Sequence, residues 1–174
     1  MTVDAAERIR AALTAAAAGP LAQLAGVRPI AIGWATVELE RAERELSAAL
    51  ALSVGDFSPA ASSIALGARC RIGSGVLADA LALVLLEPQA EGRLAATLAR
   101  LGEGPAVVWL VVDGCAATQR SSGVITSAAR HGPLGPERLV LGGPVHGPHQ
   151  LLVGERPGAD VPSRDDGPAG TIQP

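Results

Sequence analysis

Short apolar runs with the composition of β-strands recur in the same order in both halves of the chain, and this recurrence restricts the possible folds more than any other feature. The first half has one run, then a helical pattern, then two more runs, and its apolar runs lie at 29–39, 62–72 and 80–86. The second half repeats this order with a weaker middle segment, and its runs lie at 105–112, 137–141 and 150–153. The sequence therefore predicts an α+β domain made of two similar units.

Helical patterns are present in three segments, at 4–18, 40–50 and 91–101. Gly19 and Pro20 end the first pattern and Gly102 follows the third, as expected at helix C-termini. The first pattern has a thin apolar face made mostly of alanine, which indicates that this helix packs on the domain or on a partner. We therefore expect a helical extension at 1–27, before the two units.

The run at 62–72 alternates apolar residues with polar or charged ones over most of its length. Read as one strand, it places five residues on an apolar face, namely Ile64, Leu66, Ala68, Cys70 and Ile72. Arg69 and Arg71 then project from the opposite face. The preceding residues 56–59 have the composition of a turn.

Length and composition restrict the class of protein. The chain has 174 residues, of which 48% are hydrophobic and 18% are charged, so it fits one domain with a buried core and is not a wholly disordered chain. The formal net charge of −3 provides no electrostatic footprint for nucleic acid. The sequence contains neither lysine nor tyrosine, which excludes lysine Schiff-base chemistry and catalysis by a phenolic acid.

The N-terminal residues mix acidic and basic side chains and lead into an alanine-rich stretch, which does not fit a secretory signal peptide. No run approaches the roughly 18 apolar residues that a membrane-spanning helix needs. The two cysteines, Cys70 and Cys115, are interpreted as free buried thiols. We therefore expect a cytoplasmic protein that contacts no membrane, with a flexible tail at 156–174.

Two motifs flank the third helical pattern. LLEP at 85–88 is followed by GEGPAVVWLVVD at 102–113, and AIGWATVEL at 31–39 and RLVLGGPVHGPHQLLVGE at 138–155 lie before and after them. Together these segments resemble methylmalonyl-CoA epimerases and other members of the vicinal-oxygen-chelate superfamily, which includes glyoxalase I and the bleomycin-resistance proteins.

The resemblance covers about residues 29–155 and implies one domain at 28–155. It implies paired βαβββ modules, at about 29–88 and 105–153, that form one cup-shaped mixed sheet with the site inside the cup. Members of the superfamily commonly pair through their sheets, so the resemblance also implies a homodimer.

In the superfamily, a divalent metal ion is held by one side chain from each of four strands. The matching positions in this chain are Ala31, Val84, Val107 and Gln150. Three of these residues have no lone pair to donate, and the amide oxygen of Gln150 alone cannot hold a divalent ion. We therefore expect no metal and no cofactor, and metal-dependent epimerase activity is the least favoured function.

Regular alternation of the aligned strands gives the cup a largely apolar inner face. Its expected members are Ala31, Gly33, Ala35, Val84, Leu86, Val107, Trp109, Val111, Gln150 and Leu152. Such a lining suits a hydrophobic small molecule, with Gly33, Val84 and Val107 in contact with it and Trp109 and Gln150 orienting it. The alternative is that the same side chains fill a collapsed cup.

Arg69 and Arg71 are candidate partners for a ligand carboxylate or phosphate, and their alternative is a solvated strand face. His146 and His149 are candidate general acids or bases at the rim of the cup. Glu103, in the GEG turn, is interpreted as structural.

Three functions therefore stay open. The first is a metal-free binding protein, the second is a cofactor-free isomerase, cyclase or lyase, and the third is a non-catalytic interaction or structural subunit with a vestigial cup. The sequence does not decide whether the protein is an enzyme.

Overall fold

The computed structural model describes residues 2–18, 21, 26–53, 55–73, 81–112, 123–143 and 148–154. The helices are α1 (Thr2–Ala17), α2 (Leu39–Leu50) and α3 (Arg93–Leu101). The strands of the first half are β1 (Val27–Ala35), β2 (Phe57–Ser63), β3 (Ala68–Gly73) and β4 (Ala82–Pro88). Those of the second half are β5 (Gly104–Val112), β6 (Arg130–Gly132), β7 (Gly135–Leu139) and β8 (His149–Val153).

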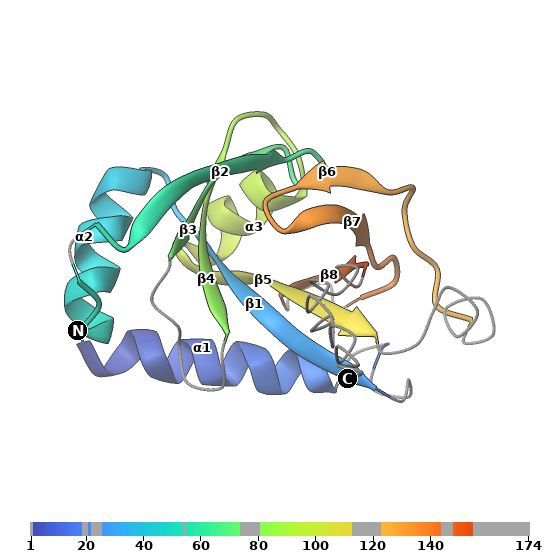
Figure 1. Ribbon diagram of the computed structural model, residues 1–174, viewed down its shortest axis with the longest axis horizontal. Coiled ribbons are helices and arrows are strands. Elements are labelled where there is room, and N and C mark those ends of the chain that lie inside the picture. Colours follow the sequence, from blue (N-terminus) through green and yellow to red (C-terminus); the bar gives the residue numbers. More distant parts are fainter. Residues whose placement is uncertain are drawn as a thin grey trace, which may run out of the picture.

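These eight strands belong to one mixed sheet with the order β2-β3-β4-β1-β5-β8-β7-β6 (Figure 1). β1 and β5 are antiparallel neighbours at the centre. β1 has β4 as a parallel neighbour on its other side, and β5 has β8. Because the strand order outward from the centre is the same in both halves, the predicted α+β fold with two strand modules is confirmed.

The sheet curls into a cup, so that its two edges come together (Figure 1). The backbone N–H of Ile64, just after β2, donates to the carbonyl of His131 in β6, with an N–O distance of 3.0 Å. This hydrogen bond holds the end of β2 beside β6, and these two strands lie furthest apart in the strand order.

Helices α1 and α2 cover the outer face of the sheet (Figure 1). Ile9 of α1 and Leu46 of α2 share one buried cluster with Ile32 and Leu110, which face outward from β1 and β5. The N-terminal extension therefore packs on the domain, and α1 covers the outer face of β5.

Between β5 and β6, the described residues 123–129 contain no helix.

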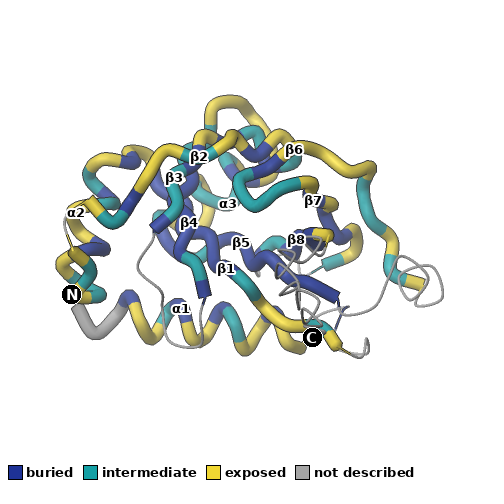
Figure 2. The backbone as a smooth tube through the Cα atoms, in the orientation of Figure 1, coloured by how far each residue is buried: buried dark blue, intermediate teal, exposed yellow. Residues whose placement is uncertain are grey.

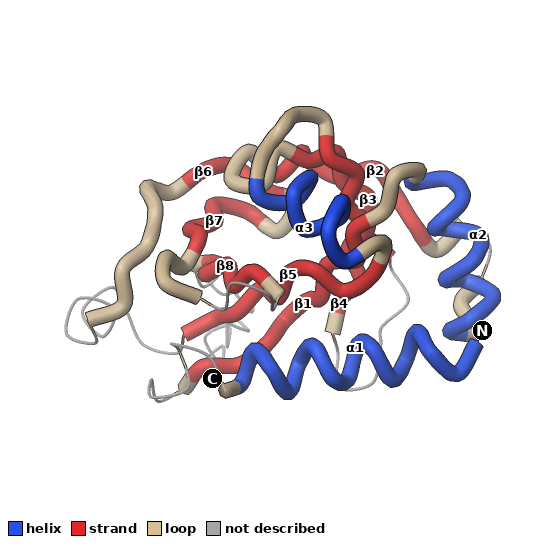
Figure 3. Tube along the Cα trace, turned by 180° about the vertical axis from the view of Figure 1, so that it is seen from behind, coloured by secondary structure: helices blue, strands red, loops and turns tan. Residues whose placement is uncertain are grey.

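Helix α3 lies on the other side of β1 and β5 from α1 (Figure 3). Its Leu94 is fully buried in a second cluster, which occupies the inside of the cup. The buried residues follow the central strands, between the two helix-covered sides (Figure 2). No helix in the described ranges is long and apolar enough to cross a membrane.

The predicted single strand at 62–72 is wrong, because the structure has two strands there. β2 begins at Phe57, inside the predicted turn at 56–59, and ends at Ser63. A tight turn follows, and β3 begins at Ala68. Gly67 adopts φ 63° in this turn, a conformation that favours glycine. Ile64, predicted on the apolar face, is 59% exposed.

The other predicted elements differ from the structure mainly at their ends. The strand predicted at 29–39 is β1, which ends at Ala35 because the chain then turns into α2. The predicted helices are found within two residues of their expected bounds. The predicted tail at 156–174 lies outside the described residues.

Candidate functional site

The deep part of the cup is closely packed around Gly33. A Cβ atom at Gly33 would lie 2.7 Å from Leu86 Cδ1, 2.8 Å from Trp109 Cζ3 and 3.0 Å from Val107 Cβ. Leu86, Val107 and Trp109 are fully buried, and so is Val84 on the same inner face. The structure therefore brings these predicted cup residues together, but as a filled core.

A buried carboxylate joins the two modules inside the cup. Glu137 of β7 is fully buried. It accepts hydrogen bonds from Trp109 Nε1, at 2.9 Å, and from the hydroxyl of Ser63 at the end of β2. Gly132 makes room for it, because a Cβ there would overlap the carboxylate. Burial raises the pKa of Glu137, and its hydrogen bonds with Ser63 and Trp109 oppose this shift.

Cys70 lies on the inner face of β3 and is a free buried thiol, as predicted. Burial is the main cause that raises the pKa of this thiol to about 11. The thiolate is therefore disfavoured, which makes Cys70 a poor nucleophile. Cys115 lies outside the described residues.

The positions that the resemblance assigns to metal ligands do not fit a metal ion. Ala31, Val84 and Val107 are fully buried apolar residues. The inner-face residue of β8 at this level is His149, which pairs in register with Val107. One imidazole cannot hold a divalent cation by itself. In the described part of the chain, no group of three or more His, Cys, Asp or Glu side chains could hold one.

Gln150 faces away from the cup, so its predicted inward orientation is wrong. Its Nε2 donates to the carbonyl of Ala16 in α1 at 2.8 Å. β8 pairs with β5 so that Leu151 lies opposite Trp109, and directly opposite residues share a face of the sheet. The inner face of β8 therefore carries Leu151. Gln150 and Leu152 were predicted on this face, so the prediction is wrong by one residue along the strand.

Arg69 and Arg71 lie outside the cup in ion pairs. Arg69 Nη2 is 3.0 Å from Glu87 Oε2 on β4. Arg71 bonds to the carboxylate of Glu43 on α2, and its Nη2 is 3.7 Å from Glu40 Oε1. This arrangement matches the solvated strand face that was the alternative for these two residues.

Of the two candidate acid–base histidines, the structure describes one. His149 Nε2 is 3.0 Å from Thr97 Oγ1 of α3. Burial lowers the pKa of His149, which favours the neutral imidazole. His146 lies outside the described residues.

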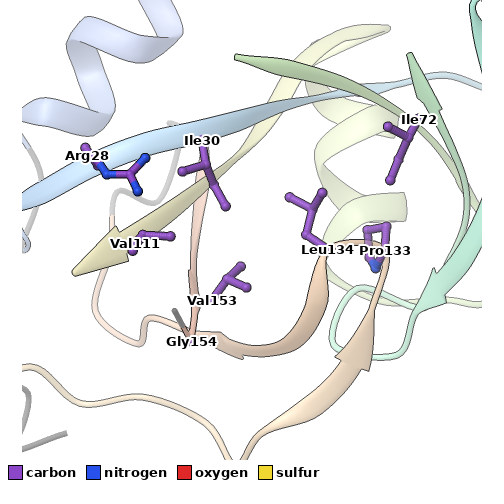
Figure 4. Close-up of a pocket in the computed structure, with 8 residues that line it drawn as sticks. All are labelled: Arg28, Ile30, Ile72, Val111, Pro133, Leu134, Val153 and Gly154. Carbon is purple, nitrogen blue, oxygen red and sulfur yellow. The ribbon is translucent and has the colours of Figure 1, made fainter. Parts of the chain in front are cut away.

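In the described part of the chain, the opposite end of the cup contains a cleft of about 510 Å³. Eight described residues line it, namely Arg28, Ile30, Ile72, Val111, Pro133, Leu134, Val153 and Gly154 (Figure 4). They come from β1, β3, β5, the β6–β7 turn and the end of β8. Six of these side chains are apolar, and Arg28 is the only charged residue among the eight.

None of the residues predicted to bind a ligand lines this cleft. Val111, which was expected on the inner face, does line it. Arg28 and Leu134 were not predicted, since they lie in or beside short segments whose orientation depends on strand pairing. Glu137 was also missed, although its spacing of two residues from Leu139 is the alternation that puts both on one face.

No protein-family model and no curated protein sequence matches this chain. Among solved structures, the chain is similar to a hypothetical protein from Bacillus halodurans, with 16% identity over 77% of this chain and 98% of that one, and a TM-score of 0.58. It is similar to methylmalonyl-CoA epimerase from Mycobacterium tuberculosis, with 22% identity over 74% and 88% of the two chains and a TM-score of 0.57.

A third similar structure is a Streptomyces coelicolor methylmalonyl-CoA epimerase variant in complex with 2-nitronate-propionyl-CoA. It is 25% identical over 73% of this chain and 93% of that one, with a TM-score of 0.55. These matches extend over most of each neighbour, and the structure has the two-module cup that the motifs implied. The chain therefore has the fold of the vicinal-oxygen-chelate superfamily, to which the methylmalonyl-CoA epimerases belong.

Proposed function

We propose that this protein binds a hydrophobic small molecule, without a metal ion, in the open end of the cup. The observation that carries the proposal is the largely apolar cleft of about 510 Å³ on the inner side of the sheet. Small-molecule sites are typically concave, mostly apolar and about 300–1,000 Å³ in volume. The epimerase in complex with 2-nitronate-propionyl-CoA is an example of ligand binding on this fold.

The donor set supports metal independence. Ala31, Val84 and Val107 offer no lone pair on the inner face, and His149 is a single imidazole beside them. A divalent ion would need several further ligands, which the described inner-face residues do not provide.

The composition of the cleft favours binding over acid–base catalysis. The eight described residues that line it include no Asp, Glu, His or Cys. The candidate base His149 lies at the other end of β8, about 13 Å from Val153 at the rise of a β-strand. The packed core around Gly33 is consistent with a vestigial cup, whereas an open cleft at the other end is not.

We also propose that the protein is a homodimer, on the basis of the resemblance, and that it is cytoplasmic, on the basis of its amino-acid sequence. Analytical ultracentrifugation of the purified protein tests the first, and fractionation of cells that express it tests the second.

Nile red, a neutral hydrophobic dye, is a suitable probe of the cleft. Leu134 is half-buried in the β6–β7 turn, so Leu134→Trp should fill the cleft without disturbing a central strand. We expect this variant to bind Nile red at least about tenfold more weakly than the parent protein, because an indole excludes the dye from the apolar surface.

The matched control is Ile125→Trp, which adds the same side chain at a position that is 67% exposed. It should leave dye binding unchanged. Circular dichroism and the melting temperature of each variant check that it is folded. Equal Nile red affinity in a folded Leu134→Trp variant and in the parent would refute the proposal.

A further inference from the structure

A β-bulge lies where β1 enters the wall of the cleft. On β5, Trp109 and Val111 are two residues apart and share the inner face. Their partners on β1 are Ala31 and Arg28, which are three residues apart, and the pairing register shifts between Pro29 and Ala31. Regular pairing would put Pro29 opposite Val111. Because β1 has one extra residue in the bulge, Arg28 lies opposite Val111 instead.

The bulge therefore brings a charged residue onto the inner face of the cup. Arg28 and Ile30 both line the cleft, although regular alternation from Ala31 would turn both of them outward (Figure 4). Bulges are frequent beside functional sites, where the extra residue redirects a side chain. The bulge is thus a structural reason why this apolar cleft contains a guanidinium.

Charge and burial are distributed unevenly in the cleft. Arg28 is exposed at the rim, whereas Val111 and Val153 are buried inside. None of the described residues that line the cleft is acidic. A ligand that matches this distribution has its negative charge at the solvent end and its apolar part inside, where burial is favourable.

We propose that the ligand is an apolar molecule with one carboxylate group, and that Arg28 binds this carboxylate. The inference rests on the proposed function and specifies the class of ligand. A guanidinium binds a carboxylate through two parallel N–H···O hydrogen bonds, which are stronger beside apolar walls than in bulk water. Arg28 also takes part in another interaction within the chain, and its five donors allow it to bind an additional anionic group.

Decanoate and decanol are the probes, since they have the same apolar chain and differ in the charge of the head group. Each is titrated into the Nile red complex of the parent protein, and dye displacement gives its affinity. We expect decanoate to bind more tightly than decanol to the parent. In Arg28→Gln, decanoate should lose about tenfold or more in affinity, while decanol stays within about twofold.

Arg10→Gln is the matched control, because Arg10 is exposed on α1 and the substitution makes the same change in net charge. It should change neither affinity. The inference is overturned if Arg28→Gln weakens decanoate and decanol equally or weakens neither. The proposed function fails separately, if neither probe displaces Nile red and Leu134→Trp retains full dye binding.

Discussion

Glu137 makes stability depend on pH in the direction opposite to that of an ordinary ion-paired carboxylate. Burial raises its pKa above the unfolded-chain value of 4.5. The folded protein therefore holds the proton more tightly than the unfolded chain does. This contribution to stability is fully present below pH 4.5 and is lost as the pH rises through the folded-state pKa.

Glu137→Gln should remove this pH dependence. Glutamine stays neutral, its carbonyl oxygen can accept from Trp109 Nε1, and its amide can donate to Ser63 Oγ. We expect the free energy of unfolding, measured with urea between about pH 4.5 and 8, to decline less with rising pH than in the parent. Glu45→Gln, at an exposed side chain, is the control. An unchanged slope in Glu137→Gln would contradict this assignment.

Gly33 is the residue that lets the deep cup close. Gly33→Ala should lower the free energy of unfolding by about 1–3 kcal/mol, because its Cβ would overlap Leu86 and Trp109. Gly92→Ala is the control, since a Cβ at Gly92 has nothing within 4 Å. Its φ of 168° is extended backbone that any residue adopts. Equal stability of both variants would show that the deep cup has free space.

At the scale of elements, the two motif acids stabilise the beginning of α2. Glu38, the residue before α2, makes no capping hydrogen bond with its own side chain. Glu103 Oε1 instead accepts from the backbone N–H of Val37 at 2.8 Å, and Glu87 Oε2 accepts from that of Leu39 at 3.1 Å. Acids near a helix N-terminus also interact favourably with its dipole. Glu87 of β4 and Glu103 of the turn between α3 and β5 therefore stabilise the beginning of α2, and these contacts agree with the structural interpretation of Glu103.

Glu103→Gln should weaken this junction. Burial opposes ionisation of Glu103, but hydrogen bonds from Arg41, Val37 and Thr36 outweigh it and lower the pKa. This stabilisation is present above pH 4.5 and is lost as the pH falls through the folded-state pKa. We expect a loss of about 2 kcal/mol at pH 7, smaller at about pH 3, in urea unfolding experiments. A pH-independent difference from the parent would contradict the argument.

The hairpin of β2 and β3 and the short strand β6 are the elements that local patterns did not resolve. Apolar residues alternate across the turn after Ser63 as they do in a strand, so periodicity alone could not find the break. The two-module order was predictable because β5 and the helices have strong local signals.

At the scale of the whole molecule, the cup is divided into a packed end and an open end. The packed end has Ala31, Val84 and Val107 at the positions where the resemblance implies metal ligands. Divalent metals should therefore not stabilise the protein. We expect the melting temperature to be the same in excess Zn²⁺, in excess Co²⁺ and in EDTA. Mass spectrometry of protein dialysed after loading provides the control, and a stoichiometric metal ion or a raised melting temperature would contradict this expectation.

The sequence by itself determined the α+β class, the repeated strand order and the N-terminal helix, which follow from composition and periodicity within single segments. The cup with its apolar inner face was implied by the resemblance. Only the tertiary structure decided that Gln150 faces outward, that a bulge brings Arg28 into the cleft, that Glu137 is buried against Trp109, and how much of the cup stays open. Each of these depends on the register and packing of segments far apart in the chain, which local patterns do not contain.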